Sequence, residues 1–270
     1  MRWLFVLDGT ERSERAAAFA LPMILPGQDE ALLLAVGEDQ TKTQLEAAVD
    51  RVRPLFAGID VREQVVLTGL AETVAQRAET EQADMVVYGS RGRRGWSRML
   101  LGSVAAYLER HLRCSLLVVR GELRPIRNIL VASSLYAEQM RAFELGNLAA
   151  QRTGAGVTVL HVMSQLALSE KASELPLTAT AEEAIDQHTR EGELLTQRLE
   201  YFRAGGVQAR PLLRHGLVLD ELVAEMRTGK YELLIIGGHR LPADLPFGRL
   251  LAEDMADEIL MNTQSPVLIA

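Results

Sequence analysis

The residues best suited to chemistry in this sequence are glycines and serines between positions 89 and 103. Gly89-Ser-Arg-Gly92 is followed, after nine residues, by Gly102-Ser103. The apolar run before them predicts a strand, and the apolar spacing after them predicts a helix. Glycines in such a loop let backbone N–H groups approach a ligand, and a serine at the helix N-cap adds a hydroxyl. The pattern is typical of a phosphate cradle, although a flexible glycine-rich connector has the same composition.

A second candidate is the acid that ends the first apolar run, Leu4-Phe-Val-Leu-Asp8-Gly-Thr10. In a doubly wound sheet, the carboxyl end of the first strand faces the crevice where ligands bind. Asp8 could there accept hydrogen bonds from ribose hydroxyls or an adenine amine. It could equally be a helix N-cap or part of an Asp-Gly turn, and the two roles are compatible.

The elements that must position these residues alternate between strands and helices, and the whole cycle occurs twice. After a short connector, Gly121-Glu-Leu-Arg-Pro125, the pattern restarts at Asn128, which predicts two α/β domains over residues 1–121 and 126–270. The predicted strands are 3–7, 31–36, 61–67, 85–88 and 116–119, then 128–132, 158–162, 208–213, 233–236 and 267–269. The predicted helices are 10–25, 41–56, 70–82 and 103–112, then 137–152, 179–204, 218–228 and 250–261.

Composition narrows the function classes. The chain has 270 residues and a net charge of −7, which argues against broad electrostatic binding to nucleic acid. Residues 1–120 carry 15 Lys and Arg against 16 Asp and Glu, whereas residues 121–270 carry 14 against 20, so the second half is the poorer host for an anion. No apolar run approaches the length of a membrane span, and a single cysteine cannot form an internal disulfide. We expect a cytoplasmic protein that binds neither membrane nor nucleic acid.

With the loop and the repeat in hand, the chain resembles the universal stress protein family, in its tandem two-domain form. Nucleotide-binding members of that family carry G-x2-G-x9-G-[ST] between the fourth strand and the last helix, and this chain satisfies every position. The resemblance implies two doubly wound α/β domains, each an open five-stranded parallel sheet of order 3-2-1-4-5 with helices on both faces. It also implies ATP as cofactor, with Mg²⁺ or Mn²⁺ on its phosphates. The implied cofactor-binding residues are Leu7, Asp8, Val36, Gly89, Arg91, Gly92, Gly102, Ser103 and Val104.

The second copy departs from this pattern at each diagnostic position. Arg240 stands where the second glycine should be, two prolines follow it, and Ser134 falls where the first copy has Asp8. Glu253-Asp254 align with Gly102-Ser103, and two carboxylates at a helix start would repel a phosphate. We predict that the C-terminal domain does not bind ATP and is structural or regulatory. These acids, with Asp257 and Glu258, could instead hold a divalent cation, but a solvated helix cap is the commoner use.

The leading hypothesis is an ATP-binding stress-response regulatory protein that holds the nucleotide in its N-terminal domain only, with no catalytic and no metal-ligating residues. The alternatives are a slow ATPase, or a non-nucleotide structural protein that acts through dimerisation. The apolar fifth strands, 115–119 and 267–269, need cover at the sheet edges. The family resemblance suggests that they pair, either within the chain as a pseudo-dimer or across a homodimer.

Overall fold

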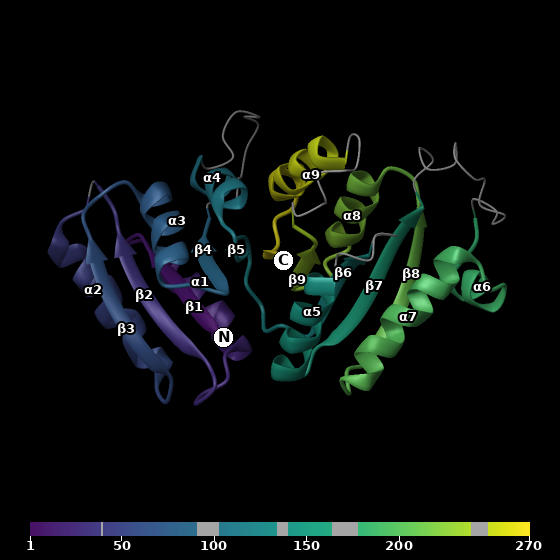
Figure 1. The fold of residues 1–270 in the computed structure, drawn as a ribbon, viewed down its shortest axis with the longest axis horizontal. Helices are drawn as coiled ribbons and strands as arrows, with labels where there is room; N and C mark the ends of the chain where they lie inside the picture. Colours follow the sequence, from purple (N-terminus) through teal and green to yellow (C-terminus); the bar gives the residue numbers. More distant parts are fainter. Residues whose placement is uncertain (39, 91–102, 134–139, 164–177, 239–247) are drawn as a thin grey trace. The chain divides into compact units, whose positions relative to one another are not determined.

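The structure is a computed structural model of the chain. It describes residues 1–38, 40–90, 103–133, 140–163, 178–238 and 248–270. The chain divides into two compact units (Figure 1). The first unit contains Met1–Pro125 together with Gln264–Ile269, and the second contains Ile126–Thr263 with Ala270. The sequence analysis assigned all of 126–270 to the second domain, so the structure differs in where the end of the chain packs.

The first unit contains a parallel sheet of order β3-β2-β1-β4-β5, the order implied by the family resemblance, with one further strand, β10, antiparallel beside β5. Helices α1 and α2 contact each other, as do α3 and α4, as expected when right-handed crossovers cover both faces of the sheet. The elements are β1 Arg2–Leu7, α1 Glu11–Ala20, the 3-10 turn Leu21–Met23, β2 Glu30–Val36, α2 Lys42–Val52, the 3-10 turn Arg53–Phe56, β3 Asp60–Val66, α3 Leu70–Thr80, β4 Met85–Gly89, α4 Ser103–His111, β5 Ser115–Val119 and β10 Val267–Ile269.

The second unit repeats the arrangement with strands in the order β9-β6-β7-β8. The backbone of Ala270 exchanges hydrogen bonds with Ile236 and Gly238, which places the end of the chain beside β9. Its elements are β6 Asn128–Ser133, α5 Met140–Thr153, β7 Gly156–Met163, α6 Ala181–Asp186, α7 Arg190–Ala204, β8 Ala209–His215, α8 Val218–Arg227, β9 Leu233–Ile236 and α9 Gly248–Asn262.

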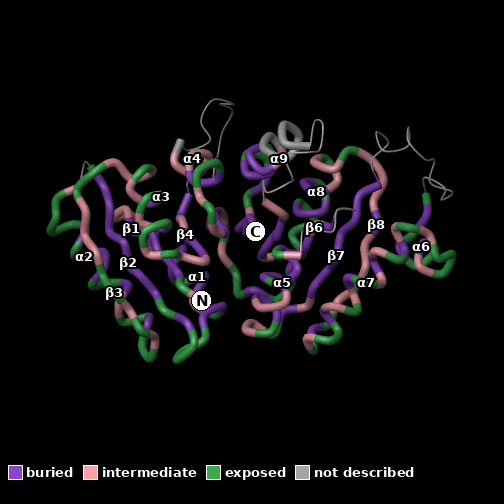
Figure 2. Tube along the Cα trace, viewed as in Figure 1, coloured by how far each residue is buried: buried purple, intermediate pink, exposed green. Residues whose placement is uncertain are grey.

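The near-continuous apolar strands are buried, as their composition predicts for a sheet covered on both faces (Figure 2). Every residue of β1 after Arg2 is buried, and so is every residue of β5 and β9. β3 is half-buried or exposed along its length, since it lies at the edge of the sheet. The core of each unit is therefore the central strands with the helix faces packed against them.

One predicted helix is wrong. The sequence predicts a single helix over 179–204, but the structure breaks it into α6 and α7 at Gln187–Thr189. His188 adopts a left-handed φ of 52°, and the Thr189 hydroxyl accepts a hydrogen bond from the Gly192 N–H at 3.1 Å, which caps α7. The absence of a Cβ at Gly192 lets α7 pack directly on the Ala184 carbonyl of α6.

Candidate functional site

The candidate site of the first unit lies at the carboxyl edge of its sheet. In register, Leu7 of β1 is the partner of Ala35, one residue before the end of β2, and Gly89 is the last residue of β4. Parallel pairing brings these strand ends together at one edge, which is where doubly wound sheets bind ligands. The side chains of Leu7 and Val36 are fully buried in the core. At these two positions, which the family resemblance implies are cofactor-binding, a ligand could therefore contact only backbone groups.

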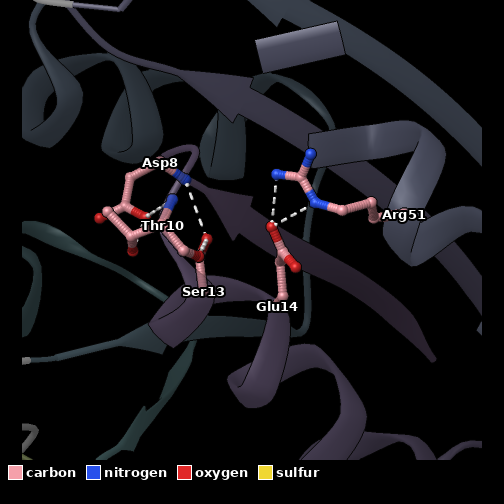
Figure 3. Close-up of polar contacts among 5 residues, drawn as sticks. All are labelled: Asp8, Thr10, Ser13, Glu14 and Arg51. Carbon is pink, nitrogen blue, oxygen red and sulfur yellow. Dashed lines mark hydrogen bonds and ion pairs between the residues drawn. The ribbon is translucent and has the colours of Figure 1, made fainter. Parts of the chain in front are cut away.

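Asp8 follows directly after β1 and organises a tight turn into α1 (Figure 3). Its Oδ1 accepts hydrogen bonds from the Thr10 N–H at 3.1 Å and from the Thr10 hydroxyl at 2.5 Å. Gly9 between them has a φ of 73°, which favours glycine. The Asp-Gly turn considered in the sequence analysis is therefore present. Among the described residues, the one cation paired with Oδ2 is Arg12, whose Nη2 lies 4.0 Å away, so part of this carboxylate's accepting capacity remains.

Ser13, which sequence reasoning did not select, ties the same turn to the first helical turn of α1 (Figure 3). Its hydroxyl donates to the Thr10 carbonyl at 2.7 Å and accepts from the Asp8 N–H at 3.3 Å. The side chain is buried. These bonds fix the position of Asp8 relative to the helix, so the carboxylate is held at the strand end before any ligand arrives.

Packing of α1 on β4 accounts for the glycine at position 89. A Cβ at this position would lie 2.6 Å from the carbonyl oxygen of Arg12 and 3.0 Å from the Cα of Ser13. Real Cβ atoms do not approach backbone this closely, so only glycine lets the start of α1 rest on the end of β4. The role is comparable to that of the glycine that permits close helix–strand packing in dinucleotide-binding turns. The Ser90 N–H continues the ladder by donating to the Val119 carbonyl at 2.9 Å.

The rest of the predicted phosphate loop is only partly covered by the structure. Arg91, Gly92 and Gly102 lie outside the described residues. Helix α4 begins at Ser103, the first residue of the predicted helix 103–112, so Ser103 belongs to the helix and is not its N-cap; Val104 is half-buried in the first turn. The structure therefore places two parts of the motif, Gly89 at the end of β4 and Ser103 at the start of α4.

Gln40 is a candidate that sequence reasoning missed. A Cβ on Gly37 would overlap the Gln40 Oε1, and one on Gly9 would lie 3.6 Å from the Gln40 Cγ. The Gln40 side chain therefore lies against the backbone that follows both β1 and β2. The signal available in the sequence was the run of polar residues directly after the second predicted strand, a position that lies at the ligand-binding edge of such sheets.

An ion pair joins the two helices on one face of the first unit (Figure 3). The Nε and Nη2 of Arg51 on α2 donate to the Glu14 Oε1 on α1 at 2.9 and 2.6 Å. The Glu14 side chain is 22% exposed and that of Arg51 51% exposed. An exposed pair of this kind contributes up to about 1 kcal/mol, so its main effect is to satisfy both charges next to the site.

The second unit lacks a comparable arrangement in the part that the structure describes. Ser134 and residues 240–246, which carry most of the predicted departures, lie outside it. Helix α9 begins at Gly248, so the pair 253–254 lies in its second turn rather than at its start, where the alignment had placed it. No group of three or more potential metal ligands is found in the described ranges. Nor does any helix in those ranges have the length and apolarity needed to cross a membrane.

Comparison with known proteins agrees with this architecture. The model of the universal stress protein family matches residues 25–120 and again residues 125–270. The chain belongs to the universal stress protein family. It does so as a tandem, because the family model matches twice, once over most of the first unit and once over the second repeat with β10.

Two curated universal stress proteins illustrate the likeness. Slr1101 of Synechocystis is 32% identical over 101 residues, which is 36% of this chain and 94% of that protein. MJ0531 of Methanocaldococcus jannaschii is 33% identical over 81 residues, which is 29% of this chain and 48% of that protein.

A solved structure is similar over both domains. The match to a universal stress protein from Archaeoglobus fulgidus covers 100% of this chain and 97% of that protein's chain, with a TM-score of 0.66 and 15% identity. That likeness extends over both domains and concerns the fold.

Proposed function

We propose that the first unit binds ATP at the carboxyl edge of its sheet and that nucleotide binding serves a regulatory role in a stress response. The observation that carries this proposal is the complete G-x2-G-x9-G-[ST] motif, whose first glycine ends β4 and whose last serine starts α4. A helix N-terminus preceded by glycines offers backbone N–H groups and a favourable dipole to phosphate. We place the protein in the cytoplasm.

The residues present fit this ligand. Asp8 is fixed at the end of β1 with Oδ2 available for a ribose hydroxyl or the base, and the backbone of Val36 ends the adjacent strand. The amides of Gly92, Gly102, Ser103 and Val104 would hold the phosphates, and Arg91 would counter their charge. The nucleotide would bring Mg²⁺ or Mn²⁺ through its phosphates.

The second unit is proposed to be a structural or regulatory partner that does not bind ATP in this manner. This follows from the sequence at the equivalent loop, where arginine and prolines replace the glycines and remove amide donors. The surplus of acidic residues in the second half of the chain points the same way.

Native mass spectrometry of freshly purified protein, with a thermal melt in added Mg-ATP, tests the nucleotide proposal. At millimolar ATP and a micromolar dissociation constant, binding stabilises the protein by about 4 kcal/mol. Gly102→Asp should abolish the ATP-dependent rise in Tm. Gly156→Asp is the matched control, because it adds the same charge in the second unit where no atom lies within 4 Å of the new Cβ. A spectrum without nucleotide mass, together with an unchanged Tm in ATP, would refute the proposal.

The pairing of fifth strands is proposed to be intramolecular, giving a pseudo-dimer within one chain. β10 pairs antiparallel with β5, with Leu268 opposite Leu117, and β4 occupies the other edge of β5. A homodimer through β5 would therefore require β10 to be exchanged between chains. Light scattering tests this proposal: a mass near 29.8 kDa supports the pseudo-dimer within one chain, and twice that mass indicates a homodimer instead.

A further inference from the structure

The side chain of Gln40 lies over the backbone that follows β1 and β2. A Cβ on Gly37 would overlap the Gln40 Oε1, and a Cβ on Gly9 would lie 3.6 Å from the Gln40 Cγ. Gly37 directly follows β2 and is buried, and Gly9 comes two residues after the end of β1. The side chain therefore covers both strand ends at the edge of the sheet where the candidate site lies.

The start of α2 fixes the position of Gln40. The Thr41 hydroxyl accepts a hydrogen bond from the Gln44 N–H at 3.2 Å, and the Gln44 side chain accepts one from the Thr41 N–H at 2.8 Å. Gln40 comes directly before this N-cap, where an apolar residue often packs against the fourth residue of the helix, here Leu45. The Gln40 Cγ and the Leu45 Cδ2 both lie within 4 Å of the Cβ position of Gly9. The methylenes of Gln40 therefore supply this packing, which leaves its amide unexplained.

The Gln40 amide is available to a ligand. Gln40 is half-buried, and its amide makes no hydrogen bond to another described residue. The glycine at position 37 leaves room for the amide, because a Cβ there would overlap it. A hydrogen-bond donor and an acceptor are therefore held together at the carboxyl edge of the first sheet.

We propose that the Gln40 amide recognises the base of the nucleotide and selects adenine over guanine, an assignment that rests on the ATP site proposed for the first unit. In that site Asp8 is available to the ribose or the base, and the backbone of Val36 ends the adjacent strand. Gly9 and Gly37, on which the Gln40 side chain lies, are the residues that directly follow these two. The base is therefore bound within reach of the amide.

Adenine and guanine differ at the edge that a glutamine reads. Adenine presents the N7 acceptor beside the N6 amino donor, so an amide can donate to N7 and accept from N6. Guanine presents two acceptors at the same edge, N7 and O6, and the amide carbonyl would face O6 with no proton between them. A matched pair of hydrogen bonds favours the correct base by roughly tenfold to a hundredfold. Backbone N–H groups that hold phosphate contribute nothing to this choice, because every nucleoside triphosphate carries the same phosphates.

The test compares the dissociation constants of Mg-ATP, Mg-GTP and Mg-7-deaza-ATP for the full-length protein, measured by isothermal titration calorimetry. The wild type should bind ATP roughly tenfold more tightly than GTP, and also more tightly than 7-deaza-ATP, which lacks N7. Gln40→Met has a side chain of similar length without the amide and should remove most of both differences. Gln40→Arg should favour GTP over ATP, because a guanidinium donates to both N7 and O6 of guanine. Gln76→Met, at an exposed position of α3, is the matched control and should keep the preference for ATP.

Gly37→Ala tests the same contact without a change to Gln40. The new methyl group would overlap the amide, which can move because it ends a flexible side chain, so the fold should be kept while the preference for ATP over GTP falls. Gly156→Ala is the control for this substitution, since nothing lies within 4 Å of its new Cβ.

The outcomes separate this assignment from the ATP site on which it rests. A wild-type protein that binds none of the three nucleotides would refute the ATP site, and the role of Gln40 with it. Equal affinities of the wild type for ATP and GTP, or a preference for ATP that persists undiminished in Gln40→Met, would overturn the role of Gln40 and leave ATP binding in place. Equal affinities for ATP and 7-deaza-ATP would overturn the contact with the N6 and N7 edge.

Discussion

Substitution of Gly89 by alanine separates a packing role from a ligand role at the same residue. In a strand with ordinary φ, replacement of glycine by alanine stabilises a protein by about 0.4–1 kcal/mol, because the unfolded chain loses freedom. At Gly89 the new Cβ would lie 2.6 Å from the Arg12 carbonyl oxygen and 2.8 Å from its carbon. Both are backbone atoms that no side-chain rotation can move, so α1 must shift away from β4.

We expect Gly89→Ala to destabilise the protein, in contrast to the usual glycine-to-alanine replacement. Overpacking of this kind costs about 1–3 kcal/mol, which exceeds the gain from reduced chain freedom. Gly89→Ala should therefore destabilise the first unit by about 2 kcal/mol and lower its Tm by roughly 6–8 °C. Because the shift of α1 also displaces the turn that holds Asp8, the ATP-dependent rise in Tm should shrink as well.

The assay is urea unfolding of the protein without nucleotide, followed by the same melt in Mg-ATP. Gly156→Ala is the matched control: it lies at the start of β7 with nothing within 4 Å of the new Cβ, and should be neutral or slightly stabilising. If Gly89→Ala unfolds at the same urea concentration as Gly156→Ala, the packing of α1 on β4 does not require a glycine at position 89, and the reasoning is refuted. Loss of the ATP response with unchanged stability would show that Gly89 acts through the phosphate loop alone.

Three further predictions concern other parts of the fold. Burial raises the pKa of the Glu225 carboxyl, but hydrogen bonds from Arg214 and Tyr231 outweigh burial and leave the pKa below its ordinary value. Glu225→Gln should therefore lower the free energy of unfolding by about 2 kcal/mol at pH 7, measured in urea melts across pH 3–7. The variant should also lose less stability than the wild type as the pH falls below about 4. Thr41→Ala breaks the capping box with Gln44 at the start of α2 and should cost about 1 kcal/mol, whereas Thr80→Ala, whose hydroxyl only bonds back within α3, should cost less in the same thermal melts. Leu268→Ala, in β10, should cost about 2–5 kcal/mol and raise the hydrogen-exchange rates of the β5 amides in the first unit, and unchanged β5 exchange would contradict the pairing.

The strands were predictable within about two residues because they are buried on both faces and appear in the sequence as short apolar runs between turn residues. The pairing of β10 with β5 was predictable only as one of two alternatives. Apolar edge strands need cover, but the sequence does not say whether that cover comes from the same chain or from a second copy. The answer depends on tertiary contacts that lie about 150 residues away in the chain.

The candidate site shows the same limit. Spacing alone identified Gly89, but the reason for a glycine there is the Arg12 carbonyl, 77 residues earlier, which no local pattern reveals. The Asp-Gly turn at Asp8 was predictable, since its signal is entirely local. The break between α6 and α7 was missed because apolar spacing continues across it, and Thr189 is an equally ordinary helix residue until its capping bond is known.

Corresponding residues in the first halves of the two repeats are 126 positions apart, so the repeats can be compared residue by residue. In the first unit the polar groups lie at the strand ends, and the interior positions Leu7 and Ala35 are apolar. In the second, the interior positions are Ser133 and His161, which are polar and buried. Loss of the phosphate loop alone would leave such interior positions apolar, since a buried polar group is costly without a partner. The His161 ring meets this cost within the sheet by donating to the Ser133 carbonyl at 3.1 Å, so the second repeat differs from the first in its interior as well as in its loop.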